Sequence, residues 1–155
     1  MATTKGTILV TGANGGLGSA IVKQIVSQPE LAAYHGLYTV RDATSASAAA
    51  LSSILAGSPS HQRDVLSLDL TKLQSVRRMA ETINARVSAS DIPPIRTLIL
   101  NAGFQEFEKQ SWTEDGLDTS FGANYLGHWL LTLLLLDSMD KESGRIVLIG
   151  SQSHE

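Results

Sequence analysis

A glycine-rich octapeptide, TGANGGLG at residues 11–18, has the composition of a ligand-binding turn. It follows the apolar residues 7–10 and opens an amphipathic run at residues 19–26, which predicts a strand, a tight turn and a helix. Backbone N–H groups and the positive end of the helix dipole converge on such a turn and favour an anion. Glycine allows a pyrophosphate to approach the backbone closely. The predicted contacts are Gly12, Asn14, Gly16, Leu17 and Gly18. The alternative is a glycine-rich loop that binds nothing.

The end of the second predicted strand, residues 36–40, bears on the kind of nucleotide. In a dinucleotide-binding fold this strand end meets the adenosine ribose. Arg41 follows the strand and can form forked, charge-assisted hydrogen bonds to a 2′-phosphate, so we predict NADP(H) rather than NAD(H). Two alternatives are a solvated turn at Arg41 and Asp42, and Asp42 as the ribose ligand if the register is different.

Two further strand ends carry candidate site residues. The third predicted strand, residues 64–70, ends in Asp69 and Leu70, and the fourth, residues 95–100, is followed by Asn101, Ala102 and Gly103. Gly103 permits a close backbone approach, and the Asn101 amide can brace neighbouring strand ends. Asp69 is alternatively an N-cap of the next helix, with Thr71 competing for that position.

Two polar residues lie in apolar surroundings later in the chain. Asn124 interrupts a long predicted helix over residues 117–139, where asparagine is mildly unfavourable. Ser151 ends the fifth predicted strand, residues 144–151, with Ser153 as a competing candidate and His154 as an incidental neighbour.

Four motifs resemble the short-chain dehydrogenase/reductase family in their order and spacing: the turn at residues 11–18, residues 101–103, the segment that begins at Asn124, and the strand that ends at Ser151. Residues 115–132 look most similar to the retinol-dehydrogenase-like branch of this family. The resemblance implies that Asp69 and Leu70 contact the adenine ring and that residues 101–103 pack beside the cofactor ribose. It further implies that Asn124 braces a catalytic lysine through a water, and that Ser151 hydrogen-bonds the substrate carbonyl oxygen.

One part of the family pattern has no match in these 155 residues. The family carries its acid/base as a Tyr-x-x-x-Lys pair after the serine, and none of Tyr34, Tyr38 and Tyr125 is followed by lysine at that spacing. The chain is therefore expected to be C-terminally incomplete, naturally short, or supplied with the acid by another chain. A chain ending here leaves the fifth strand as an exposed apolar edge, which favours the first reading or a covered interface.

The elements that position these residues alternate between strands and helices. Helices are predicted over residues 16–28, 43–56, 72–89 and 117–139, the second of them a weak one with Ala46, Ala49, Ala50 and Ile54 on its apolar face. We predict one α/β domain over residues 1–155, a Rossmann-type three-layer sandwich with parallel strands in the order 3-2-1-4-5. The nucleotide is expected to lie at the switch between strands one and four.

The helix over residues 117–139 is apolar around most of its circumference, which indicates a central or interface position. In the family this helix commonly packs against its copy, so we expect a homodimer or tetramer through residues Leu117–Met139. His128 in this helix is expected to pack and not to bind a metal, because no second ligand lies at metal-binding spacing.

The overall composition excludes several classes of protein function. The net charge of −3 gives no electrostatic case for nucleic acid, and the absence of cysteine excludes thiolate catalysis and disulfides. The N-terminus has no apolar targeting core and no run is long enough to span a membrane, so a cytoplasmic protein is expected.

The resemblance implies an NADP(H)-dependent oxidoreductase acting on a small carbonyl or alcohol. A nucleotide-binding protein or subunit without turnover is the alternative that the missing tyrosine–lysine pair suggests. A non-redox enzyme on the same fold is a third possibility, because a fold does not determine a function.

Overall fold

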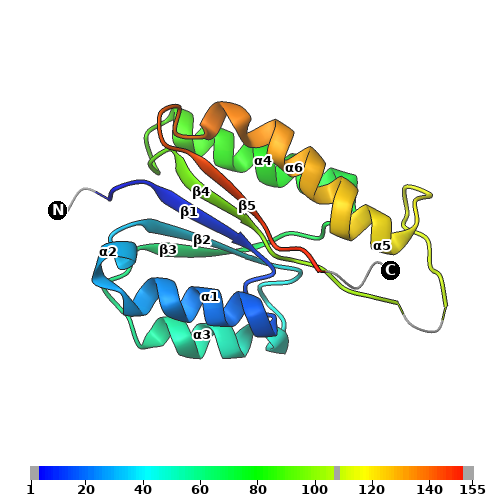
Figure 1. Ribbon diagram of the computed structural model, residues 1–155, viewed down its shortest axis with the longest axis horizontal. Coiled ribbons are helices and arrows are strands. Elements are labelled where there is room, and N and C mark those ends of the chain that lie inside the picture. Colours follow the sequence, from blue (N-terminus) through cyan, green and yellow to red (C-terminus); the bar gives the residue numbers. More distant parts are fainter. Residues whose placement is uncertain (1–3, 107–108, 152–155) are drawn as a thin grey trace.

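The structure is a computed structural model and describes residues 4–106 and 109–151. Its centre is a parallel sheet with the strand order β3-β2-β1-β4-β5, as predicted (Figure 1). The strands are β1 (Thr7–Thr11), β2 (His35–Val40), β3 (Arg63–Ser67), β4 (Ile95–Leu100) and β5 (Arg145–Leu148). Because all four strand pairs are parallel, the carboxyl ends of the strands meet at one edge of the sheet.

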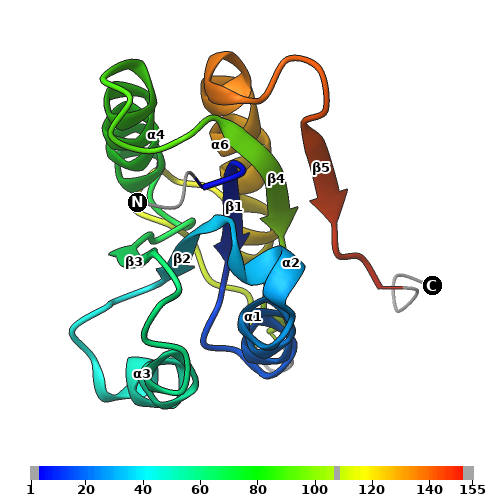
Figure 2. The ribbon, with the colours of Figure 1, turned by 90° about the vertical axis from the view of Figure 1, so that its left-hand side faces the viewer.

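Helices cover both faces of the sheet, which confirms the three-layer arrangement (Figure 2). Helices α1 (Gly16–Ser27) and α3 (Ala49–Ala56) lie on one face, and α4 (Leu73–Ser88) and α6 (Gly127–Leu135) lie on the other. The short helix α2 (Pro29–Ala32) follows α1 directly, since Pro29 ends one helix and occupies the first turn of the next.

Two apolar cores result, one on each side of the sheet. Alternation along β1 sends Leu9 to the core that contains Ile83 and Leu131, and Val10 to the core that contains Val22 and Leu51. The central strands are buried on both faces, as expected for a parallel sheet covered by helices.

The apolar face predicted for the second helix is correct only at Ile54, which is partly buried and packs against the core. Ala46, Ala49 and Ala50 are exposed, whereas Leu51 and Leu55 of α3 are buried together with Ala48. Leucine side chains bury far more apolar area than alanine, so the helix turns its leucines to the core. A 3-10 turn at Ala46–Ala48 precedes α3, and its Ala48 is buried.

The helix predicted over residues 117–139 is helical from α5 (Thr119–Phe121) to a 3-10 turn at Leu136–Ser138. It begins two residues later than predicted, because the Asp118 side chain caps it by accepting a hydrogen bond from the Phe121 backbone N–H at 2.8 Å. Between α5 and α6 lies a π-helical turn, Gly122–Leu126, which contains Asn124. π-Turns of this kind are frequent at functional sites.

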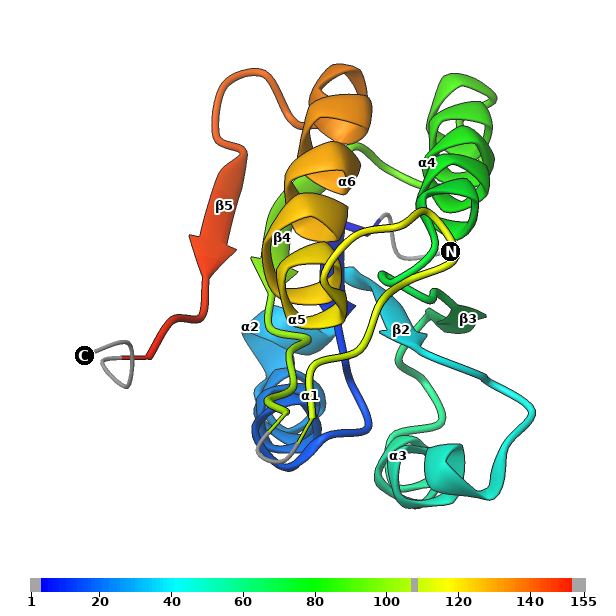
Figure 3. The same ribbon diagram turned by 90° about the vertical axis from the view of Figure 1, so that its right-hand side faces the viewer.

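Strand β5 forms one edge of the sheet (Figure 3). All four of its residues are exposed, with 69% of Leu148 accessible to solvent. The expected exposed apolar edge is therefore present in the described part of the chain. Among residues 4–106 and 109–151, no helix combines the length and the apolar character needed to cross a membrane.

Candidate functional site

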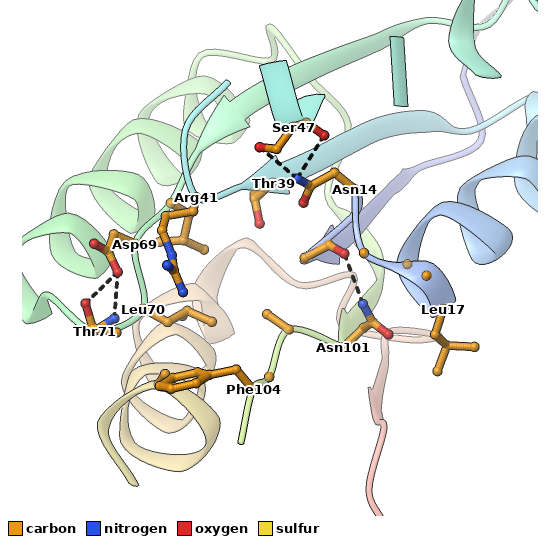
Figure 4. Close-up of a pocket in the computed structure, with 18 residues that line it drawn as sticks. Asn14, Leu17, Thr39, Arg41, Ser47, Asp69, Leu70, Thr71, Asn101 and Phe104 are labelled. Carbon is orange, nitrogen blue, oxygen red and sulfur yellow. Dashed lines mark hydrogen bonds between the residues drawn. The ribbon is translucent and has the colours of Figure 1, made fainter. Parts of the chain in front are cut away.

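A groove of about 480 Å³ lies at the carboxyl ends of the strands, at the switch between β1 and β4 (Figure 4). All eleven residues predicted to contact a cofactor line this groove: Gly12, Asn14, Gly16, Leu17, Gly18, Arg41, Asp69, Leu70, Asn101, Ala102 and Gly103. The topology brings them together, because loops after β1, β2, β3 and β4 all open at the same edge. Their contact with a nucleotide stays a prediction.

Three glycines of the turn differ in what surrounds them. Gly12 has a positive φ of 65°, and a Cβ there would lie 2.8 Å from the Ala102 Cα. A Cβ on Gly18 would overlap the Gly12 carbonyl oxygen, whereas one on Gly16 would meet nothing within 4 Å. The fold therefore requires glycine at positions 12 and 18, but leaves open space beside Gly16, which lines the groove.

The start of α1 is suited to an anion. Gly15 occupies the N-cap position and no side chain caps this helix end, and its first turn contains no acidic residue. Free N–H groups at an uncapped helix N-terminus attract negative charge, and Gly16 allows that charge to approach. The residues present thus fit a pyrophosphate.

Thr11 and Asn101 join the glycine turn to the end of β4. The Asn101 amide Nδ2 donates to the Thr11 carbonyl at 3.0 Å and to the Gly12 carbonyl at 3.2 Å, which confirms the predicted bracing. The backbone N–H groups of Asn101 and Ala102 both donate to the Thr11 Oγ1, each at 3.0 Å. The Thr11 hydroxyl therefore organises the turn after β4.

His128 packs in the core as predicted, with 3% of its surface exposed. Its ring also makes two hydrogen bonds, between Nε2 and the Thr11 Oγ1 at 2.9 Å and between Nδ1 and the Asn124 carbonyl oxygen at 3.3 Å. Burial lowers the pKa of His128 below its usual value, and the Asn124 carbonyl opposes this only in part.

Arg41 directly follows the last residue of β2, which confirms the register on which the NADP(H) prediction depends. Its side chain extends into the groove beside Leu70 (Figure 4). Asn14 lies nearby and donates from Nδ2 to the Ser47 carbonyl oxygen at 3.2 Å. Asp42 does not line the groove. Its Oδ1 accepts hydrogen bonds from the Thr44 N–H at 2.9 Å and hydroxyl at 2.7 Å, which lower the pKa of Asp42.

The N-cap alternative for Asp69 and Thr71 is wrong. Asp69 Oδ1 accepts from the Thr71 N–H at 3.0 Å and hydroxyl at 2.7 Å, and the N-cap position of α4 belongs to Lys72. The backbone N–H of Leu73, in the first turn of α4, instead donates a hydrogen bond at 3.1 Å to the Oδ2 of Asp115, which lies 42 residues further along the chain. Asp69 lines the groove, and the adenine contact that the family resemblance implies for it stays a prediction.

The two predicted catalytic residues have different positions relative to the groove. The Asn124 amide pairs with the Phe104 backbone, donating to its carbonyl at 2.7 Å and accepting from its N–H at 3.0 Å. Phe104 lines the groove, so Asn124 braces the groove wall directly. Ser151 lies beyond the end of β5, is exposed and is not among the groove residues. Ser153 and His154 lie outside the described residues.

Seven groove residues were not predicted: Gly15, Thr39, Ser47, Leu68, Thr71, Phe104 and Ala123. Several of them neighbour predicted positions and could have been included on that ground. Ser47 carries no such signal, because it lies in an Ala/Ser-rich stretch without a clear pattern.

Comparison with known proteins adds independent findings. The family described as short chain dehydrogenase matches residues 6–155. A short-chain dehydrogenase of Talaromyces variabilis, iccH, is 53% identical over 153 residues, which are 97% of this chain and 42% of that protein. A chloroplastic protochlorophyllide reductase of Daucus carota is 36% identical over 152 residues, covering 95% of this chain and 35% of that protein.

A solved structure supports the same fold. The short-chain dehydrogenase of Streptomyces avermitilis has a TM-score of 0.68 and 28% identity, covering 97% of this chain and 51% of that one. The chain thus spans about half, or less, of the length of each of these three proteins.

Proposed function

Because the chain belongs to the short-chain dehydrogenase family, we propose that it is part of an NADP(H)-dependent oxidoreductase acting on a small carbonyl or alcohol. The observation that carries this proposal is the groove, in which an uncapped glycine turn, a basic strand end and the turn after β4 face one another. Bound nicotinamide would supply the hydride chemistry.

The proposed roles divide along the groove. The turn at residues 12–18 holds the pyrophosphate through its backbone N–H groups. Asp69 and Leu70 contact the adenine, and residues 101–103 pack beside the nicotinamide-side ribose. Arg41 holds the 2′-phosphate and so selects NADP(H) over NAD(H).

At the reacting end, the Ser151 hydroxyl donates a hydrogen bond to the substrate oxygen and stabilises the charge that develops there. Asn124 holds the Phe104 segment through both atoms of its amide and so keeps the groove wall in place. A hydrophobic or aromatic carbonyl is the substrate class we propose, following the branch of the family that the sequence resembles.

The cofactor preference is tested with the Arg41→Ala variant of the full-length protein. Loss of a charged hydrogen-bonding partner costs about 1.5–3 kcal/mol, so NADPH should bind roughly 10- to 150-fold more weakly. NADH affinity should stay within about twofold, because NADH has no 2′-phosphate. Nicotinamide fluorescence titration measures both affinities. The matched control is Arg77→Ala on the exposed face of α4. Equal weakening of NADPH and NADH would contradict the 2′-phosphate role.

We also propose that the helix containing α6 forms a homo-oligomer interface. Phe121, Tyr125, Trp129 and Leu133 recur every four residues, and each is between 45% and 58% exposed. The rings of Phe121 and Tyr125 stack with centroids 5.4 Å apart. An aromatic surface of this kind is typical of a protein–protein interface.

Trp129→Glu in the full-length protein tests this interface. A buried, unpaired carboxylate at an interface is strongly unfavourable, so the dimer or tetramer should dissociate to monomers at micromolar concentration. Static light scattering measures the mass, with Gln74→Glu on the exposed face of α4 as the control that adds the same single negative charge. A monomeric unaltered protein would rule the interface out.

A further inference from the structure

We propose that His128 is a positioning residue of the nucleotide groove: its neutral ring fixes the direction of the Thr11 hydroxyl, and with it the turn at residues 101–104. This inference rests on the proposed function in one respect, namely that this turn forms part of the nucleotide site. Both nitrogens of the ring make hydrogen bonds within the chain, so the role of His128 goes beyond apolar packing and needs no bound metal.

The hydrogen-bond inventory of Thr11 determines the state of the histidine. A threonine hydroxyl offers one proton and two lone pairs. The N–H groups of Asn101 and Ala102 occupy both lone pairs of the Thr11 Oγ1. The hydroxyl proton is then the only group left to join Oγ1 to the His128 Nε2, 2.9 Å away. Nε2 therefore accepts this hydrogen bond and carries no proton.

The second nitrogen of the ring must carry the proton. The His128 Nδ1 faces the Asn124 carbonyl oxygen at 3.3 Å, and a carbonyl can only accept. The ring is thus the neutral Nδ1–H tautomer, held at both nitrogens. The Thr11 and Asn124 contacts also reach the two ends of the turn, since Thr11 holds Asn101 and Ala102, and the Asn124 amide holds Phe104.

Protonation of His128 would break this arrangement. A proton on Nε2 would point at Oγ1, whose lone pairs are already occupied, so at least one N–H of Asn101 or Ala102 would lose its partner. The groups that hydrogen-bond to the ring, Thr11 from β1 and the Asn124 carbonyl of the π-turn, are uncharged. No charged side chain is a cause of its altered pKa. Nothing in this shell therefore compensates a positive charge.

The consequence is an acid-sensitive groove. Nucleotide binding favours the ordered turn and hence neutral His128, so protons compete with the nucleotide. Burial lowers the pKa of His128 in the free protein from its usual value of 6.5. The affinity for the nucleotide is constant at pH values above this lowered pKa, and it falls as the pH drops through it.

Three full-length proteins test this inference: the unaltered protein, His128→Gln and His128→Phe. Glutamine can place an amide oxygen near the position of Nε2 and accept from Thr11, whereas phenylalanine keeps the ring volume without any acceptor. Nitrogen-15 NMR of the histidine ring should show the Nδ1–H tautomer in the unaltered protein. Amide hydrogen exchange at Asn101 and Ala102 should accelerate about tenfold in His128→Phe and return toward the original rate in His128→Gln.

NADP⁺ affinity between about pH 5 and 8 is the second readout. The NADP⁺ affinity of the unaltered protein, divided by that of His128→Gln, should fall at acid pH, because only the unaltered protein has the titrating imidazole. Titration of the ligand phosphate affects both proteins equally and cancels in this ratio. A pH-independent ratio, an Nε2–H tautomer, or unchanged exchange at Asn101 and Ala102 in His128→Phe would each overturn the proposal.

Failure of the proposed function is recognised separately. If the unaltered protein does not bind NADP⁺, the nucleotide assignment fails, while the tautomer and the amide exchange still decide the role of His128. If His128→Phe does not fold, the tautomer of the unaltered protein and the exchange rates of His128→Gln decide it.

Discussion

Replacement of Gly18 by alanine is expected to destabilise the fold by about 3 kcal/mol, the upper range for forcing an extra methyl group into a packed site. The added Cβ would overlap the Gly12 carbonyl oxygen and lie 2.8 Å from the Asn101 Nδ2. Both are held by the hydrogen bond that joins the glycine turn to β4, so neither can move away freely. Urea denaturation of the full-length protein measures the loss as a lower midpoint.

Gly16→Ala is the matched control, and it separates fold from ligand. No atom lies within 4 Å of the added Cβ, and alanine is favourable in a helix, so stability should change by less than about 0.5 kcal/mol. NADPH affinity should nevertheless fall about tenfold, because the methyl group occupies the space proposed for the pyrophosphate. Unaltered NADPH binding by Gly16→Ala would place the phosphates elsewhere, and an unaltered stability of Gly18→Ala would refute the packing argument.

Ser151→Ala is expected to lower kcat for carbonyl reduction about 10²- to 10³-fold, as removal of one donor to a developing oxyanion does. NADPH affinity should stay within about twofold, because Ser151 does not line the groove that we propose binds the nucleotide. The measurement is NADPH oxidation by the full-length protein, using an aromatic aldehyde or ketone that the unaltered protein reduces.

Ser153→Ala is the control for this experiment, since Ser153 is the competing serine two positions further along. Its kcat should match that of the unaltered protein. A large loss of kcat in Ser153→Ala with normal activity in Ser151→Ala would exchange the two assignments. Equal activity of all three proteins would remove the serine from the proposed chemistry.

Much of the groove was predictable because local sequence patterns define where parallel strands end. The turn at residues 11–18, Arg41 after β2 and residues 101–103 after β4 were each recognisable from a few neighbouring residues. Once the strands are parallel, their carboxyl ends must share one edge of the sheet. The eleven predicted cofactor contacts lie in one groove, and this could be predicted without knowing any individual side-chain contact.

Contacts between distant segments were not predictable in this way. The helix start at Leu73 is satisfied by Asp115, and the ring of His128 reaches Thr11 across 117 residues of sequence. Apart from Ile54, the buried face of α3 was mispredicted because an alanine-rich segment carries little hydrophobic periodicity. In each case the partner lies on another element of the fold, so a local sequence pattern does not identify it.

The sequence by itself determined the family, the strand order and the edge of the sheet at which a nucleotide is expected, because short motifs identify the family resemblance, and that resemblance implies the fold. Only the tertiary structure decided the hydrogen-bond partners of Asn124, Asp69, Thr11 and His128. A polar side chain can satisfy itself with several neighbours of similar energy, and the choice depends on which donors and acceptors the folded chain leaves unpaired beside it.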